Sequence, residues 1–155
     1  MSFTISGLPL DPFKPLFALN DEALAAQGVK RVVTSAKPGF PCRVSLHDAE
    51  PGQSVLLLNY EHQTADTPYR SSYAIYVNEA AGETWRGRNA VPGSLRGRPI
   101  SLRAFSAEGM LVGAEVASGD ALEEAITRRF ADGTAAYLHA HNAAHGCFVA
   151  RIDRG

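Results

Sequence analysis

Short apolar segments separated by glycine and proline run through most of this sequence. Its 155 residues include 14 Gly and 9 Pro, residue types that favour turns and interrupt helices. Between them, residues 29–35 and 73–77 carry β-branched or aromatic side chains at near-alternate positions, which is typical of strands. We therefore expect a fold built from short strands with few helices.

Other segments are also predicted to be strands. Val55-Leu56-Leu57-Leu58 is apolar on both faces, which indicates a central strand covered on both sides. Ala107-Glu108-Gly109 separates two apolar segments and predicts a hairpin. The further predicted strands are residues 3–6, 42–46, 54–60, 99–106, 111–117, 135–141 and 147–153.

Two main helices are predicted. The first covers residues 21–27, with Asn20 as its N-cap and Gly28 as its left-handed end. The second covers residues 120–131, with Asp120 and Glu123 forming a capping box. One apolar stripe at helical spacing supports the second helix, and it consists of Leu122, Ala125, Ile126 and Phe130.

These elements predict an α+β fold with a mostly antiparallel sheet, two main helices and short connections. The length fits a single domain spanning residues 1–155, which can bury a sizeable core. Parallel crossovers would need more helices than the pattern supplies.

Composition excludes several classes of protein. Fifteen basic and 16 acidic side chains give a net charge of −1, which argues against a general attraction to nucleic acid or to a membrane surface. No apolar run approaches the ~20 residues that span a bilayer, and the N-terminus lacks a secretory signal pattern. Two cysteines are too few for a disulfide framework, so we expect a cytoplasmic protein with Cys42 and Cys147 reduced.

The segment from His139 to Cys147 concentrates polar side chains. In a strand over residues 135–141, His139 and His141 point to one face, about 6.6 Å apart along the backbone. Two imidazoles at this spacing can carry protons near pH 7. Together with His145 and Cys147 they also form an alternative set of ligands for zinc or a similar metal, the only cofactor that the sequence suggests. The metal-free alternative is a hydrogen-bonded, partly exposed sheet face.

Cys147 is a candidate nucleophile. It follows Gly146, which allows close approach to the backbone, and several imidazoles are near in sequence. A catalytic thiolate needs a cation or an imidazole beside it. The competing interpretation is a small buried hydrophobic residue at the start of a strand.

Arginines inside apolar strand patterns form the other candidate site. Arg43, Arg103 and Arg151 are costly to bury unless their planar groups are paired. If they face the side of His139 and His141, they form a cationic hollow suited to a carboxylate or a phosphate. Alternatively, each arginine pairs with an internal acid and only stabilises the fold; the candidate acids are Asp48, Glu61 and Asp153.

Residues 84–107 contain five arginines and no acid, at positions 86, 88, 96, 98 and 103. This segment can grip phosphates, or it can be a mobile solvated loop, as its glycines favour. Few aromatic residues are interleaved, which argues against stacking on single-stranded nucleic acid. The chain also lacks a Gly-x-x-x-x-Gly-Lys loop, a Gly-x-Gly-x-x-Gly fingerprint and a Gly-x-Ser-x-Gly elbow.

Several of these segments resemble a known family, the domain-of-unknown-function family 1203. The resemblance covers nearly the whole chain and implies a small stand-alone bacterial protein, with no activity to transfer. It is carried by Phe40-Pro41-Cys42-Arg43-Val44-Ser45-Leu46, Leu56-Leu57-Leu58-Asn59-Tyr60-Glu61-His62, Pro68-Tyr69-Arg70, Ser101-Leu102-Arg103-Ala104, and His141-Asn142-Ala143 with Gly146-Cys147.

The sequence thus predicts a site for a small anionic molecule, without deciding between binding and catalysis. The alternatives are the metal site and an interaction module without chemistry, and a homo-oligomer is left open. Arg43, Arg103 and Arg151 are the expected anion clamps. Asn142 is the expected polar contact, with His62, Tyr69 and Arg70 in addition, and the candidate catalytic residues are His139, His141 and Cys147.

Overall fold

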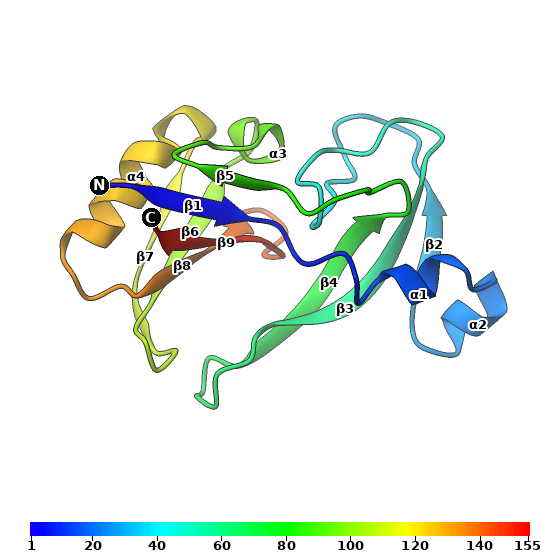
Figure 1. Ribbon diagram of the computed structural model, residues 1–155, viewed down its shortest axis with the longest axis horizontal. Helices are drawn as coiled ribbons and strands as arrows, with labels where there is room; N and C mark the ends of the chain where they lie inside the picture. The colour runs from blue at the N-terminus through cyan, green and yellow to red at the C-terminus, as the bar shows by residue number, and fades with distance from the viewer.

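Two antiparallel sheets make up most of this computed structural model, which describes residues 1–155 (Figure 1). The larger sheet has six strands in the order β5-β1-β9-β8-β6-β7, and the smaller has three in the order β2-β3-β4. The strands are β1 (Phe3–Ser6), β2 (Lys30–Val33), β3 (Ser54–Gln63), β4 (Ser71–Asn78), β5 (Arg86–Arg88), β6 (Ile100–Phe105), β7 (Leu111–Ala117), β8 (Tyr137–Asn142) and β9 (Phe148–Arg154).

Both predicted helices are present but shorter than predicted, and two further short helices occur. Only α4 (Leu122–Ala131) exceeds five residues, and the others are α1 (Lys14–Phe17), α2 (Asp21–Ala25) and α3 (Gly93–Arg96). The antiparallel α+β class is confirmed, whereas the expectation of two main helices is met only in part, because α4 alone is long. None of the helices has both the length and the apolar character needed to cross a bilayer.

Of the two predicted N-terminal helix caps, one is present and the other is not. Asn20 caps α2 as predicted, because its side chain accepts from the Ala23 amide at 2.8 Å. The predicted capping box at Asp120 is wrong. Asp120 lies within a 3-10 turn (Gly119–Ala121), and α4 begins after Ala121 without a side-chain cap. The tight turn places Asp120 one residue too early to accept from the first turn of α4.

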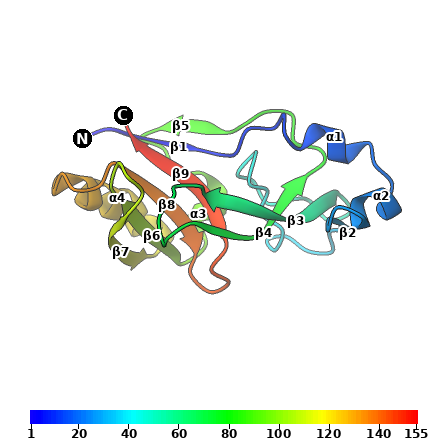
Figure 2. The same cartoon turned by 90° about the horizontal axis from the view of Figure 1, so that it is seen from below.

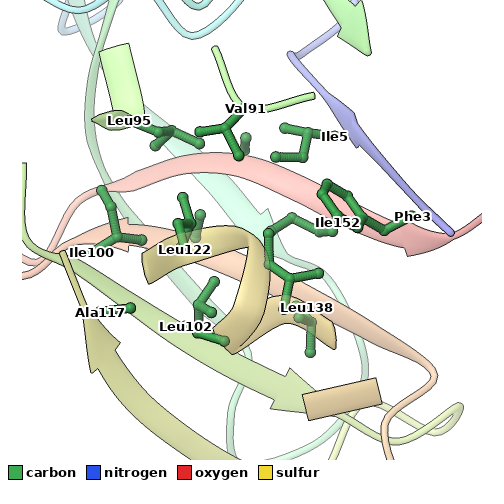
Figure 3. Close-up of a cluster of buried hydrophobic side chains, with 14 of the residues drawn as sticks. Phe3, Ile5, Val91, Leu95, Ile100, Leu102, Ala117, Leu122, Leu138 and Ile152 are labelled. Atoms are coloured by element: carbon green, nitrogen blue, oxygen red, sulfur yellow. The ribbon is translucent and has the colours of Figure 1, made fainter. Parts of the chain in front are cut away.

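The main core lies between α4 and one face of the larger sheet (Figure 3). In β6, Ile100, Leu102 and Ala104 are buried, as alternation of side chains along a strand requires. The predicted stripe of α4 covers them, and all four of its residues are buried. Because α4 occupies this face, the opposite face of the sheet is left for the β3–β4 hairpin.

The smaller sheet packs against that opposite face through a second core. Phe148 of β9 lies in this core with Ile75 and Val77 of β4. Figure 2 shows β3 and β4 reaching from the smaller sheet towards β8 and β9. Polar residues on β8 that point away from α4 therefore lie between the two sheets.

Residues 42–46 do not form the predicted strand. Only an isolated bridge joins Cys42 to Tyr76, and the following residues turn back on themselves. The Leu46 amide donates to the Cys42 carbonyl at 3.0 Å, and Leu46 adopts a positive φ of 52°. This turn, rather than a strand, carries Arg43 into the space beside the β8–β9 connection.

Candidate functional site

Guanidinium and imidazole groups from distant parts of the chain lie on one face of the larger sheet. Arg103 of β6 is opposite His139 of β8, and His139 is opposite Arg151 of β9. Directly opposed residues of an antiparallel pair point to the same face. His141 is likewise opposite Ser101 and Phe148. The register therefore brings Arg103, Arg151, His139 and His141 to one side of the sheet.

His62 of β3 completes a cluster of three imidazoles between the sheets. Its ring centroid lies 5.0 Å from that of His141 and 6.2 Å from that of His139. The ring of Phe148 stacks on His62, with 5.3 Å between centroids and planes 10° apart. One buried ring nitrogen of each histidine has no hydrogen-bond partner, namely Nδ1 of His62, Nδ1 of His139 and Nε2 of His141.

Burial keeps these imidazoles uncharged. It is the main cause that lowers the pKa of both His139 and His141 to about 3. Nearby positive charge adds to this effect, from Arg151 and Arg103 at His139 and from Arg103 at His141. The pKa of His62 is also lowered, first by burial and then by Arg103. At neutral pH the cluster is uncharged, and its imidazoles are weak proton acceptors.

The two arginines of this face differ in what they contact. Arg151 is exposed, donates to Asp153 at 2.9 Å and lies 4.0 Å from the centroid of the Tyr137 ring. Arg103 is half-buried and donates only to Ser101 Oγ, at 3.4 Å. Burial lowers the pKa of Arg103. Arg151 therefore matches the structural alternative of an internal ion pair, whereas Arg103 has no acid as partner.

Arg43 is the most buried charged residue of the chain, at 1% exposure. Its Nε donates to the Phe148 carbonyl at 2.6 Å, its Nη1 to the Pro41 carbonyl, and its Nη2 to Cys147 Sγ at 3.0 Å. None of these partners is a carboxylate. Burial is the main cause that lowers the pKa of Arg43. The fold thus holds a guanidinium away from water without an acidic partner.

None of the three acids predicted as partners for the strand arginines pairs with Arg43 or Arg103. Asp48 accepts two hydrogen bonds from Arg98, from Nη1 at 3.2 Å and from Nη2 at 2.6 Å. Glu61 accepts from Arg70 Nε at 2.5 Å. Asp153 accepts from Arg151. No acid is therefore left beside Arg43.

Cys147 lies beside Arg43, directly before β9. Its Sγ accepts from Arg43 Nη2 and, at 3.4 Å, from Nδ2 of Asn142. The Oδ1 of Asn142 is buried and has no hydrogen-bond partner. No imidazole donates to or accepts from Cys147, so its polar neighbours are a guanidinium and an amide. His141 does not contact the Cys147 sulfur, but its Nδ1 lies 2.9 Å from the carbonyl oxygen of Gly146, the residue before Cys147.

A cavity of about 410 Å³ opens beside these groups. It lies between the turn that holds Arg43, strand β4 and the β8–β9 connection. Its polar lining includes Arg43, Arg98, Asn142, His145 and Cys147, and its apolar wall includes Leu57 and the two tyrosines Tyr73 and Tyr76. Of the predicted site residues, the fold brings Arg43, Asn142, His145 and Cys147 to this cavity.

The other predicted ligand-binding residues lie elsewhere. Arg103, Arg151 and His62 do not line the cavity. Tyr69 and Arg70 lie at the end of the β3–β4 hairpin, where the Tyr69 ring contacts that of Phe105 with 6.5 Å between centroids. Arg70 is paired with Glu61. These residues lie on the surface or on the sheet face that carries His139 and His141, which we call the histidine face, and not in the cavity.

The alternative metal set is not gathered at one point. No group of three or more His, Cys, Asp or Glu side chains is arranged to hold a metal ion. His145 is exposed on the β8–β9 connection, whereas His139 and His141 lie buried between the sheets. The exposed His145 and the two buried histidines are therefore not placed to bind one metal ion together.

A second and larger hollow, of about 970 Å³, lies on the other side of the turn at Asp48. Its lining mixes Lys37 and His47 with the carboxylates of Asp48, Glu50 and Glu83. Like charges repel an anion at this surface. The hollow therefore suits a small anion less well than the cavity at Arg43.

The arginine-rich segment is more ordered than predicted. Arg86 and Arg88 lie in β5, paired to β1, and Arg96 ends α3. Arg96 pairs with Glu123, and Arg98 pairs with Asp48. The segment is therefore not one continuous loop, because β5 pairs with β1 and α3 forms within it.

The sequence missed the cavity's apolar wall and the Asp48–Arg98 pair. Leu57 of β3 and the tyrosines Tyr73 and Tyr76 of β4 looked like ordinary strand residues, and only the packing of these strands beside the β8–β9 connection makes them part of the cavity wall. The spacing of Asp48 and Arg98, 50 residues apart, carries no local signal. Both residues lie outside the strands, and only the tertiary fold brings them together.

The fold and this site define a class: an antiparallel α+β protein that holds a buried arginine and a cysteine at a small cavity between its sheets. The chain matches the family model described as a protein of unknown function (DUF1203) over residues 39–154. It belongs to the DUF1203 family, and the match includes every residue of the cavity named above. No curated protein and no solved structure matches the chain.

Proposed function

We propose that this protein binds a small anionic molecule in the 410 Å³ cavity, with Arg43 as the central contact. The observation that carries the proposal is the burial of Arg43 without a carboxylate partner. An isolated buried charge is costly unless an opposite charge approaches it. An anionic ligand at this position supplies that charge.

Arg43 retains donors for such a ligand. A guanidinium has five N–H groups, and three of them donate to Phe148, Pro41 and Cys147. The other two are free to form charge-assisted hydrogen bonds, which are stronger than neutral ones. Arg98 also lines the cavity, but Asp48 already balances its charge. The proposal therefore places the anionic group of the ligand at Arg43.

The rest of the cavity suits a small organic anion. Its volume lies within the range of about 300–1,000 Å³ that is usual for ligand sites. Leu57, Tyr73 and Tyr76 supply apolar contacts, and Asn142 adds a polar one. A ligand with a carboxylate or a phosphate at one end and an apolar body matches this lining.

We infer that the histidine face stabilises the backbone that forms one side of the cavity. His141 contacts the Gly146 carbonyl oxygen and so holds the β8–β9 connection, which carries Asn142 and Cys147. We assign His139, His62 and Arg103 to the same supporting role. Tyr69, Arg70 and Arg151 have no role in ligand contact in this proposal.

Thermal stabilisation by a panel of carboxylates and phosphates tests the proposal. A ligand at ten times its Kd stabilises the folded state by about 1.4 kcal/mol, which raises Tm by about 3–6 °C. We expect at least one member of the panel to do so beyond sodium chloride of the same ionic strength. No rise in Tm from any member would contradict the proposal.

A blocking variant locates the binding. Ala143→Phe fills the cavity from the β8–β9 connection and leaves Arg43 in place, so the rise in Tm should be lost. Ala136→Phe is the matched control, because Ala136 is also exposed but does not line the cavity. An equal rise in Tm in the Ala143→Phe variant would place the anion elsewhere.

We also infer a cytoplasmic location and one folding domain over residues 1–155. The two unpaired cysteines support a reducing compartment. Pairing of β1 with β9 places the N-terminal and C-terminal segments in one sheet, which supports a single domain. The net charge of −1 supports a small ligand over nucleic acid as partner.

A further inference from the structure

We propose that Cys147 is a reactive thiol, activated by Arg43 and Asn142, and that small carbon electrophiles modify it through the cavity. The proposal uses the same cavity as the proposed function but does not depend on anion binding. It also replaces the histidine partners expected from the sequence with a guanidinium and an amide.

Two N–H donors converge on one sulfur. Arg43 Nη2 lies 3.0 Å and Asn142 Nδ2 lies 3.4 Å from Cys147 Sγ. A neutral thiol is a weak acceptor, whereas a thiolate gains a charge-assisted hydrogen bond from a guanidinium. The arrangement therefore favours the form of sulfur that acts as a nucleophile.

The charge balance of the cavity agrees with this assignment. Arg43 has no carboxylate among its hydrogen-bond partners, and burial is the main cause that lowers its pKa. The Cys147 sulfur contacts it directly. A negative charge on this sulfur would balance the buried guanidinium at short range.

A second observation points to a ligand beside the sulfur. Asn142 is 8% exposed, and its Oδ1 is buried without a partner although its Nδ2 is used. Buried amide oxygens in folded proteins are normally hydrogen-bonded. An N–H or O–H donor of a molecule bound next to Cys147 would satisfy it.

Cys42 is a built-in comparison for Cys147. It is also buried, at 1% exposure, but its Sγ accepts only from the Asn78 amide, at 3.2 Å, and it does not line the cavity. Cys147 does line the cavity, so a small reagent has a path to it. The two thiols should therefore react at very different rates in one molecule.

The covalent step is a simple displacement. The Cys147 sulfur attacks the electrophilic carbon of an alkyl halide such as iodoacetamide, and an S–C bond forms. The C–I bond breaks, and iodide leaves with the bonding electron pair. The proton of the thiol passes to solvent, and no oxidant or reductant is needed.

Alkylation by iodoacetamide at pH 7, followed by peptide mass spectrometry, tests the inference on the unaltered protein. Free cysteine is only about 3% ionised at this pH, so an activated thiol can react about tenfold faster. We expect labelling of Cys147 at least about tenfold faster than that of free cysteine, and little labelling of Cys42. Labelling of Cys147 no faster than that of free cysteine would overturn the inference.

Variants identify the activating groups. Arg43→Met should slow labelling of Cys147 about tenfold or more. Because Arg43 also binds two backbone carbonyls, the nearly isosteric Asn142→Asp provides a second variant, which places a carboxylate beside the sulfur and should slow labelling as strongly. Asn59→Asp, at an exposed site on β3, is the matched control and should leave the rate unchanged. An unchanged rate in Asn142→Asp would also overturn the inference.

The two proposals fail separately. If no anion raises Tm but labelling of Cys147 is fast and sensitive to Asn142→Asp, the proposed function fails and the reactive thiol stands. If an anion raises Tm but labelling is slow, the reverse holds.

Discussion

Arg43 Nη2 donates a hydrogen bond to Cys147 Sγ across 3.0 Å, although the two residues are 104 positions apart in the chain. The arginine lies in a turn between β2 and β3 of the smaller sheet, and the cysteine lies directly before β9. The Phe148 and Pro41 carbonyls fix the guanidinium between them. This contact joins the two sheets at the wall of the cavity and underlies both functional proposals.

Acid should destabilise the protein through its buried histidines. In the folded state the pKa of His139 is about 3, against an ordinary 6.5, so the unfolded chain binds more protons between these values. The free energy of unfolding therefore falls as pH falls from about 6.5 towards 3, by about 2 kcal/mol per such histidine between pH 7 and pH 5. Urea denaturation at a series of pH values measures this.

Replacing one buried histidine should flatten that pH profile. His139→Phe fits among the rings of Phe105, Tyr137 and Phe148 and should remove about 2 kcal/mol of the loss between pH 7 and pH 5. His145→Phe, at an exposed position, is the control. A profile as steep in His139→Phe as in the wild type would show that His139 is not held neutral.

The Asp48–Arg98 pair should contribute to stability more than the surface pairs do. It is bidentate, and its side chains are only 11% and 20% exposed. Asp48→Asn leaves a mostly buried guanidinium without its counter-charge, so we expect a loss of about 2 kcal/mol in the free energy of unfolding. Chemical denaturation compares it with Glu123→Gln, which breaks an exposed pair and should cost less than about 1 kcal/mol. Equal losses would contradict the assignment.

The end of α3 packs so closely against the turn before α4 that Gly119 has no room for a side chain. A Cβ there would lie 1.5 Å from the Arg96 carbonyl oxygen, which is backbone and cannot rotate away. Gly119→Ala should therefore lower the free energy of unfolding by about 2 kcal/mol or more. Gly97→Ala is the matched control, because its Cβ would meet nothing within 4 Å. If both variants were equally stable, this close packing would be wrong.

The elements predicted well are those with a strong local pattern. The strands predicted at residues 73–77 and 99–106 are found in β4 and β6, and the predicted apolar stripe of α4 is buried on one side of that helix. The Asn20 cap is equally local. The predicted strand at residues 42–46 failed because its turn depends on the Cys42–His47 and Leu46–Cys42 backbone bonds and on a bridge to Tyr76. Alternation of apolar residues does not reveal such contacts.

The site was predicted in its residue types but not in its partners. Arginines and histidines do meet on one sheet face, because strand order β9-β8-β6 aligns Arg151, His139 and Arg103. The cavity itself forms around Arg43, whose position depends on a turn, and around the β8–β9 connection. Sequence spacing alone could not distinguish the paired Arg151 from the unpaired Arg43.

Competition between an anion and iodoacetamide tests the central claim most directly. If Arg43 serves both a bound anion and the Cys147 sulfur, an anion that raises Tm should slow labelling of Cys147 in proportion to its occupancy of the cavity, and sodium chloride of equal ionic strength should not. A saturating anion that leaves the labelling rate of Cys147 unchanged would contradict a single cavity shared by the two.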